Sequence, residues 1–178
     1  MKILDVGCGK NKYKGDKKDK VVGLDIVKLP CVDKVHDLEK FPWPFQNNEF
    51  DLVICNHTLE HFSSLVKTME EIWRVGKPNS TIKIKVPYFA HPGAFWDPTH
   101  KVFFTTRTFD YFTEESKFNY YSRARFKILS QKIIFMVNRP RISKLFEFFI
   151  NINPTFYERF LSRVFPAEQL FVELRVIK

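Results

Sequence analysis

The chain begins with a short apolar run that ends in a turn containing two glycines. Ile3, Leu4 and Val6 form a run of strand length, and Gly7 and Gly9 follow directly. Glycine has no Cβ, so such a turn lets the backbone approach a ligand closely. A strand that ends in a Gly-x-Gly turn is typical of a nucleotide-type cofactor site in an open α/β sheet. We therefore interpret the downstream segments as parts that complete this site or cover it.

The composition indicates one globular domain, which we expect to span residues 1–178. With 44% hydrophobic residues, the chain is long enough to bury a core without disulfides or metals. Its three cysteines fit neither a disulfide framework nor a CxxC metal motif, which favours reduced thiols and a cytoplasmic location. No apolar stretch approaches the ~20 residues of a membrane span, and the start of the chain has no signal-peptide pattern.

The net charge of +9 is concentrated in the last third of the chain. Residues 1–116 are almost neutral, whereas residues 117–178 hold 12 Lys and Arg against 4 Asp and Glu. This asymmetry fits an anionic partner, such as nucleic acid, an acidic substrate or a membrane surface. It equally fits a basic surface that only keeps the protein soluble, so both interpretations stay open.

Strand and helix patterns alternate along the chain. Apolar runs and alternation predict strands at 3–6, 21–26, 32–38, 50–55, 81–86, 126–137 and 170–177. Helices are predicted from Ser63 or Ser64 to Val75 and over 106–115, with an aromatic loop between 87 and 106. The polar segment 10–20 has no helical face, so we expect a loop as the first crossover. This order predicts a three-layer α/β fold, with a mostly parallel sheet and an antiparallel final hairpin.

An insertion at 139–169 separates the last two predicted strands and is longer than a hairpin needs. Two short amphipathic helices are predicted in it, at 143–152 and 154–165. Its many apolar side chains fit a core or a dimer interface, or else a cover for a greasy or anionic acceptor or a membrane surface. Aromatic and basic side chains together also suit stacking on single-stranded RNA, although no recognised RNA-binding motif is present.

Four motifs follow one another in the first half of the chain: LDVGCG at 4–9, VVGLD at 21–25, HDLEKFPWPFQNNEFDLVICNHTLEHF at 36–62 and EEIWRVGKPNSTIKIKVP at 70–87. In this order and spacing they resemble the class I, Rossmann-like S-adenosylmethionine-dependent methyltransferases of the small type 11 family. The resemblance is close in the first half and loose over 88–178. It implies a Rossmann-like fold, S-adenosyl-L-methionine as cofactor and in-line methyl transfer.

The resemblance also implies which residues hold the cofactor. Gly7 and Gly9 match the glycines that pack against its amino-acid part. Asp25 ends the second strand, where a carboxylate can accept from both ribose hydroxyls, and Asp37 matches the position that accepts from the adenine amino group. The full set implied in this way is Asp5, Gly7, Cys8, Gly9, Asp25, Ile26, Asp37, Leu38, Asn56 and His57.

Histidines supply the candidates for a general base, because imidazole accepts a proton near neutral pH. The loop HPGAFWDPTH places His91, Asp97 and His100 close together, just after the fifth predicted strand. We hypothesise that this loop covers the acceptor, with His57, His91 or His100 as the base. The alternative is that these side chains only fix the loop. The 91–97–100 spacing is not diagnostic of metal ligands, so the sequence predicts no metal.

Several functions stay open from sequence. A nicotinamide dehydrogenase would need a third glycine in G-x-G-x-x-G, where this chain has Lys12. A catalytically silent cofactor-binding subunit is another alternative, because only Met1 and Lys2 precede the first strand. The C-terminal insertion or another chain would then have to close the cofactor pocket. For an enzyme, a small-molecule acceptor such as a sugar, lipid or other metabolite is favoured over RNA, and a homodimer could form through the C-terminal aromatic helices.

Overall fold

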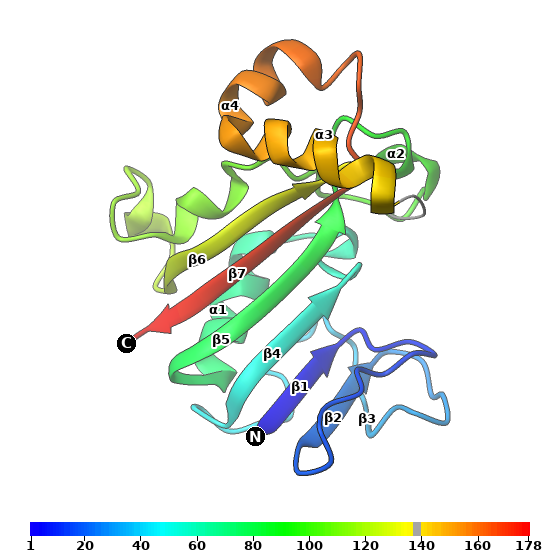
Figure 1. Ribbon diagram of the computed structural model, residues 1–178. Coiled ribbons are helices and arrows are strands. Elements are labelled where there is room, and N and C mark those ends of the chain that lie inside the picture. The colour runs from blue at the N-terminus through cyan, green and yellow to red at the C-terminus, as the bar shows by residue number, and fades with distance from the viewer. Residues whose placement is uncertain (137–139) are drawn as a thin grey trace.

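A computed structural model describes residues 1–136 and 140–178, without the side chains of residues 119 and 140–143. One seven-stranded sheet runs through the molecule in the order β3-β2-β1-β4-β5-β7-β6 (Figure 1). Its strands are β1 (Lys2–Val6), β2 (Lys20–Asp25), β3 (Lys34–Val35), β4 (Phe50–Asn56), β5 (Gly76–Pro87), β6 (Arg125–Ile134) and β7 (Gln169–Ile177). The α-helices are α1 (Leu65–Val75), α2 (Gly93–Trp96), α3 (Pro140–Ile152) and α4 (Pro154–Phe156).

The sheet confirms the predicted Rossmann-like α/β class. β1 to β5 pair in parallel, and Val53 of β4 lies between Leu4 of β1 and Ile82 of β5. β7 inserts between β5 and β6 and pairs antiparallel with both, which forms the expected final hairpin. The chain runs outward from β1 to β3 and then returns to β4 on the other side of β1. Ligands bind at the carboxyl ends of the strands where the order reverses in this way.

Helix α1 covers one face of the sheet and buries its apolar side. Ser64, rather than Ser63, is the N-cap, and its side chain accepts a hydrogen bond from Lys67 N. Met69, Ile72 and Val75 are fully buried. Gly76 ends the helix with an extended backbone, and β5 begins at that same residue, five positions before the predicted strand.

The opposite face of the sheet is covered by loop rather than by helix. The segment between β1 and β2 is irregular, as predicted, and its Tyr13 packs against Ile3, Leu52 and Ile54. In Figure 1, α1 lies behind the sheet, and among the described residues no helix crosses the front of β1, β4 and β5. Further along the sheet, the ion pair between Lys83 and Glu173 joins β5 to β7 at 3.3 Å. On this face, the third layer of the fold is therefore a thin cover of loop residues.

Two predicted elements are shorter in the structure. The helix expected over 106–115 is a 3-10 turn, Thr108–Phe112, although its predicted apolar residues Phe109 and Phe112 are fully buried. Threonine hydroxyls compete here for backbone groups, because Thr113 Oγ1 donates to Asp110 O and thereby favours turns over a longer helix. The third strand has only the two residues of β3. The strand expected over 126–137 ends at Ile134, and residue 137 lies outside the described residues.

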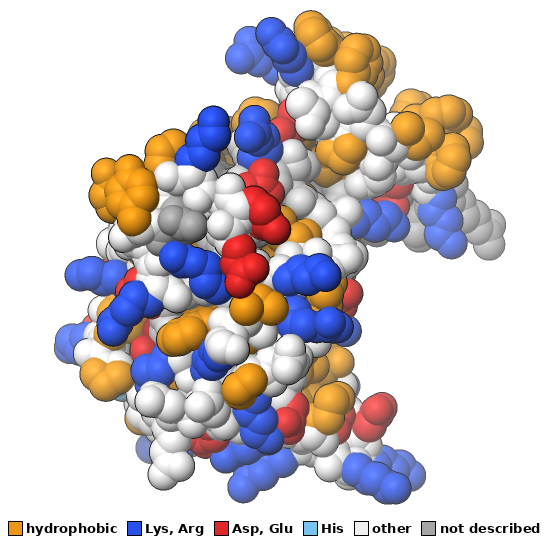
Figure 2. Space-filling view, turned by 90° about the vertical axis from the view of Figure 1, so that its left-hand side faces the viewer, with side chains coloured by type: hydrophobic (Ala, Val, Ile, Leu, Met, Phe, Trp, Pro, Cys, Tyr) orange, Lys and Arg blue, Asp and Glu red, His pale blue; other side chains and the backbone are white. Residues whose placement is uncertain are grey.

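The C-terminal insertion lies at the end of the sheet where β4 and β5 finish (Figure 1). Expected as two helices, it forms α3, α4 and a π-helical turn at Tyr157–Leu161. Among its apolar side chains, Ile150 and Tyr157 are buried, whereas Phe148 and Phe149 are 64% and 62% exposed. Figure 2 shows hydrophobic side chains gathered at the top of the molecule, beside Lys and Arg. Of the predicted alternatives, core is therefore wrong for most of this surface, and a dimer interface or a cover for an acceptor or a membrane stays a prediction. No described helix has the length and apolarity needed to cross a membrane.

Candidate active site

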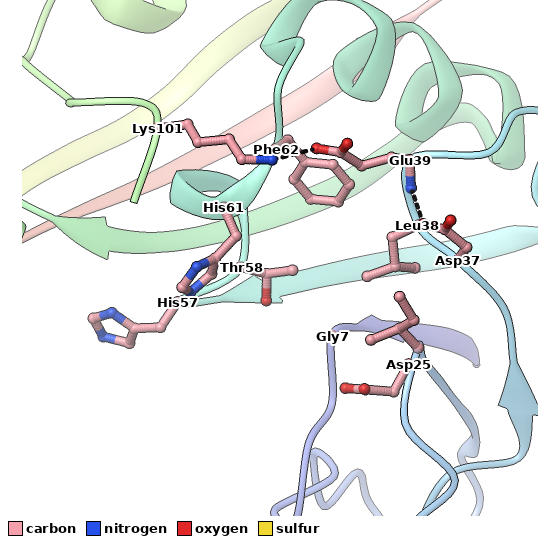
Figure 3. A pocket seen from close by; sticks show the side chains of 11 residues that line it. Gly7, Asp25, Asp37, Leu38, Glu39, His57, Thr58, His61, Phe62 and Lys101 are labelled. Atoms are coloured by element: carbon pink, nitrogen blue, oxygen red, sulfur yellow. Dashed lines mark hydrogen bonds and ion pairs between the residues drawn. The ribbon is translucent and has the colours of Figure 1, made fainter. Parts of the chain in front are cut away.

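Three adjoining clefts lie at the carboxyl ends of the parallel strands, and His57 lines all three. The first, here called the Asp25 cleft, has a volume of about 430 Å³ and is lined by residues that include Gly7, Asp25, Ile26, Asp37, Leu38, Thr58 and Phe62 (Figure 3). The Gly9 cleft, of about 370 Å³, is lined by Asp5, Gly7, Cys8, Gly9, Lys10, Asn11, Asn56 and Lys85. The His100 cleft, of about 410 Å³, is lined by residues that include Glu60, His61, His91, Asp97, His100 and Gln169.

The glycine turn is held to β2 by its own backbone. Gly7 N and Cys8 N both donate to Leu24 O, at 2.8 and 3.2 Å. Gly7 has a φ of 66°, and a Cβ placed on it would lie 2.6 Å from Thr58 Oγ1. Gly9 has a φ of 52°, but a Cβ there would meet nothing within 4 Å. The turn is therefore packed on its Thr58 side and open on the side of the Gly9 cleft, where a ligand can approach the backbone.

Asp25 is fixed by two backbone groups at the end of β2. Its Oδ2 accepts from Gly9 N at 2.8 Å, and its Oδ1 accepts from Val27 N at 3.0 Å. Each carboxylate oxygen has two acceptor positions, so both oxygens can still accept from hydroxyl groups in the cleft. Asp25, Asp37, Leu38 and Phe62 line the same cleft, and Figure 3 shows Leu38 between Asp25 and the Phe62 ring. A carboxylate and an apolar wall thus face one cavity, which suits a sugar joined to a flat ring.

Behind the turn, Asp5 and Cys8 are both buried. Asp5 Oδ2 accepts from Tyr13 N at 2.6 Å, which ties the loop after β1 back to the strand. Burial raises the pKa of the Asp5 carboxyl, although the Tyr13 hydrogen bond opposes this. Burial also raises the pKa of the Cys8 thiol to about 12, so that the thiol stays neutral at physiological pH. These two side chains are therefore suited to holding the turn rather than to reacting.

His57, the residue common to the three clefts, has a left-handed backbone with a φ of 51°. Such a conformation is uncommon outside glycine and is found preferentially at functional sites. The surrounding strands hold it in place. His57 N donates to Lys85 O of β5 at 2.8 Å, and the amide Nε2 of Gln169 lies 3.1 Å from the ring Nε2 of His57. Asn56, the last residue of β4, is exposed beside it.

The loop from 87 to 106 supplies much of the His100 cleft and places the two predicted loop histidines there. His91 Nδ1 accepts from Gly93 N at 3.0 Å, whereas His100 Nδ1 lies 2.9 Å from Ala94 O and must donate to it. Asp97 bonds to neither histidine. Its Oδ1 accepts from Thr99 N and Thr99 Oγ1, and these bonds lower the pKa of the Asp97 carboxyl. The structure therefore brings His57, His91 and His100 together, while Asp97 fixes the loop.

A polar bridge at the rim of the Asp25 cleft was not expected from the sequence. Lys101 Nζ donates to Ser63 Oγ at 2.9 Å and to Glu39 Oε1 at 3.2 Å, and Ser63 N donates to the same Glu39 oxygen at 2.6 Å. The Ser63 bonds and then Lys101 lower the pKa of the Glu39 carboxyl. This bridge joins the 87–106 loop to the segment after β3 (Figure 3). Thr58, Glu60, Phe62 and Lys85 are further lining residues that the sequence did not single out.

Comparisons with known proteins agree with this geometry. Residues 4–84 match a family described as a methyltransferase domain, of type 11. An S-adenosylmethionine-dependent methyltransferase from Archaeoglobus fulgidus superposes with a TM-score of 0.63 at 16% identity, covering 98% of this chain and 85% of that one. Phosphoethanolamine N-methyltransferase 2 from Haemonchus contortus, solved with S-adenosyl-L-methionine, gives 0.61 at 14% identity, covering 100% of this chain and 49% of that one. No curated protein matches.

A third similar structure shows that the fold does not fix the reaction. The [4+2]-cyclase SpnF has a TM-score of 0.62 at 16% identity and covers 99% of this chain and 74% of its own. Similarity at this level of identity establishes the fold alone. The fold is that of the class I S-adenosylmethionine-dependent methyltransferases. The match of residues 4–84 to the type 11 methyltransferase domain family, together with this fold, supports S-adenosylmethionine-dependent methyltransferase activity, as the motifs predicted.

Proposed function

We propose that the enzyme transfers the methyl group of S-adenosyl-L-methionine to an oxygen or nitrogen atom of a small molecule. The observation that carries this proposal is the meeting of three clefts at His57. A bound cofactor would place its adenosine in the Asp25 cleft and its amino-acid part in the Gly9 cleft. Its sulfonium would then lie near Gly7 and His57, beside the His100 cleft, where the acceptor would bind.

The residues that line the clefts support a role for each part of the cofactor. Asp25 is fixed so that both oxygens can accept from the ribose hydroxyls, and Asp37 would accept from the adenine amino group. Ile26 and Leu38 would flank the base. Next to the open Gly9 backbone, Gly7, Cys8 and Asn56 would contact the amino-acid part, while Asp5 holds the turn. Lys85 lies in the same cleft and could pair with the cofactor carboxylate.

Among the three candidate bases, the hydrogen bonds favour His100, and the position at the junction of the clefts favours His57. His91 Nδ1 accepts a hydrogen bond, so neutral His91 carries its hydrogen on Nε2 and offers a donor instead of a base. His100 donates from Nδ1, which leaves a lone pair on Nε2. His57 lies at the junction of the clefts. We propose that one of these two rings removes the acceptor proton as the methyl group is transferred.

The size of the His100 cleft favours a small acceptor. About 410 Å³ is within the range of sites for small molecules. An RNA methyltransferase is the alternative, which the basic surface of residues 117–178 would serve. A silent cofactor-binding subunit is a second alternative, and both are separated from the main proposal by the experiment below.

Calorimetric titration with S-adenosylhomocysteine tests the cofactor site. We expect binding by the wild type and a loss of at least tenfold in Asp25→Ala, because hydrogen bonds to charged groups contribute about 1.5–3 kcal/mol each. Asp33→Asn is the matched control, since Asp33 accepts from Gly23 N outside the clefts. Binding of NAD, with no binding of S-adenosylhomocysteine, would contradict the proposal.

Methyl transfer from labelled cofactor to a cell extract tests the reaction. We expect label in small molecules, with the same yield after ribonuclease treatment. Label confined to RNA would establish the alternative acceptor. Cofactor binding with no labelled product in any fraction would indicate the silent subunit.

We also propose that residues 1–178 act as one cytoplasmic domain and that two copies associate through α3. The single sheet joins both halves of the chain, and the exposed Phe148 and Phe149 leave apolar surface for such contact. Light scattering coupled to gel filtration should give twice the monomer mass for the wild type and the monomer mass for Phe148→Ser. A monomeric wild type would exclude this dimer.

A further inference from the structure

We propose that Glu60, His61 and His100 bind one divalent transition-metal ion, with Zn²⁺ as the best match. The candidate ligand atoms of these three side chains all lie within 4.8 Å of one another. His61 lines both the Asp25 cleft and the His100 cleft, so the site stands on the border between them. Sequence spacing could not indicate it, because Glu60 and His61 lie in the 3-10 turn after β4, whereas His100 lies in the 87–106 loop.

Glu60 is the strongest single indication of a missing ligand. Its side chain is 1% exposed, and neither carboxylate oxygen makes a hydrogen bond within the part of the chain that the structure describes. His57 Nδ1 lies 3.4 Å from Glu60 Oε1, and the two form an ion pair only when the ring is protonated. A buried carboxylate without hydrogen bonds is strongly unfavourable unless a cation neutralises it. A bound metal ion would supply that charge.

The backbone around Glu60 fixes the position of this carboxylate. Glu60 lies in the 3-10 turn Leu59–His61, and its carbonyl oxygen accepts from Lys101 N at 2.7 Å and from Val102 N at 3.1 Å. These bonds hold the 87–106 loop against the turn that carries two of the three proposed ligands. The His61 and His100 rings are thereby brought to a centroid separation of 4.9 Å.

The hydrogen bonds of both histidines leave the tautomer that can bind a metal. His100 Nδ1 donates to Ala94 O at 2.9 Å, which leaves its Nε2 with a lone pair. Thr99 Oγ1 donates its one hydrogen to Asp97 Oδ1, so it accepts from His61 Nδ1 at 2.8 Å, and His61 Nε2 also keeps a lone pair. Metal-binding histidines typically donate their second nitrogen to a carbonyl or carboxylate in this way. The chain from Asp97 through Thr99 therefore orients His61.

The ligand types select the class of metal. Two imidazoles and one carboxylate are a ligand set of zinc enzymes that keep a fourth position open, and other divalent transition metals accept the same set. Ca²⁺ and Mg²⁺ prefer oxygen ligands alone. The three ligand atoms now lie up to 4.8 Å from one another. Bonds of about 2.0–2.2 Å to one Zn²⁺ ion would bring them closer together than that. We therefore expect a small inward movement of the 87–106 loop on binding.

The open fourth position would face the acceptor, and this part of the inference rests on the proposed function. A metal-bound hydroxyl group loses its proton more readily than a free one. The resulting oxygen would form the bond to the methyl carbon as the carbon–sulfur bond breaks, which leaves S-adenosylhomocysteine. Because a ligating His100 cannot accept a proton, His57 would receive the acceptor proton. The metal thus indicates an oxygen nucleophile.

Metal titration of chelator-treated protein tests the site without any need for activity. We expect one Zn²⁺ per chain in competition with a chromogenic chelator, and a Co²⁺ absorption spectrum typical of mixed nitrogen and oxygen ligands. Glu60→Gln, His61→Ala and His100→Ala should each weaken Zn²⁺ binding by at least tenfold. His36→Ala is the matched control, because His36 bonds to Lys40 O away from the three clefts, and it should bind as the wild type does.

Two results would overturn the proposal. One is the absence of stoichiometric Zn²⁺ and Co²⁺ binding by the folded wild type. The other is equal Zn²⁺ affinity in the wild type and in every ligand variant that retains the wild-type circular dichroism spectrum. S-adenosylhomocysteine is titrated into the same samples. Loss of its binding with Zn²⁺ binding intact would count against the proposed cofactor site and leave the metal site standing.

Discussion

The two sides of the candidate active site are built from different parts of the structure. On the cofactor side, the ends of β1, β2 and β4 place the residues, and most hydrogen bonds have a backbone group as donor. The bonds from Gly7 to Leu24 and from Gly9 to Asp25 are examples. On the acceptor side, a long loop is fixed by side chains, as in the chain from Asp97 to His61. Strand ends therefore position the cofactor side of the site, and side-chain contacts position the acceptor side.

The largest expected effect is on the cofactor side, in Gly7→Ala. The left-handed backbone would cost about 1–2 kcal/mol, and the contact with Thr58 would add about 1–3 kcal/mol as overpacking. Urea unfolding should therefore show a loss of about 2–5 kcal/mol in the free energy of unfolding.

Gly9→Ala is the matched control for that substitution. Its Cβ would enter open space, so only the backbone cost of about 1–2 kcal/mol is expected. The same Cβ would project into the Gly9 cleft, and S-adenosylhomocysteine should bind more weakly. A larger stability loss in Gly9→Ala than in Gly7→Ala would contradict the proposed packing of the turn.

This asymmetry explains how much could be predicted from the sequence. A strand that ends in a glycine turn is a local pattern, so Gly7, Gly9 and Asp25 could be assigned to one sheet edge before the structure was known. The bond from His61 to Thr99 joins residues 38 positions apart, and that from Lys101 to Glu39 joins residues 62 apart. Nothing in local periodicity encodes such pairs. Apolar content likewise could not distinguish the exposed insertion from core.

The next effect concerns the acceptor side, where Asp97→Ala should loosen the loop. This substitution removes the acceptor of two Thr99 hydrogen bonds, which also orient His61. Hydrogen exchange measured by mass spectrometry should become faster in residues 91–102. Exchange in residues 1–35 should be unchanged, because the cofactor side does not depend on this network. Equal acceleration in both regions would show that the two sides are not independent.

The same carboxylate gives the acceptor side a defined pH dependence. Its folded pKa is lowered, so its contribution to stability is fully present above the unfolded value of about 3.9 and is lost as the pH falls through the folded pKa. Loop exchange in the wild type should therefore be constant from pH 5 to pH 8, after correction for intrinsic rates. It should rise below about pH 4. A rise near pH 6 would assign the dependence to histidine instead.

A smaller effect is expected where the two sides are joined, in Lys101→Met. The bridge to Glu39 and Ser63 is partly exposed, and such ion pairs contribute about 0–1 kcal/mol. Thermal unfolding should show a loss within that range that decreases at high salt. Lys67→Met, at the exposed start of α1, is the control and should be neutral. A loss above about 2 kcal/mol would show that the bridge is essential to the fold.

The smallest effect tests the buried acid behind the glycine turn. Burial raises the folded pKa of Asp5, so ionised Asp5 destabilises the folded state as the pH rises through that pKa. In Asp5→Asn, the side-chain oxygen can still accept from Tyr13 N, and the ionisation is removed. The variant should therefore gain stability over the wild type between pH 3 and pH 7. A gain that shrinks as the pH rises would show that the Tyr13 bond depends on the charge and outweighs burial.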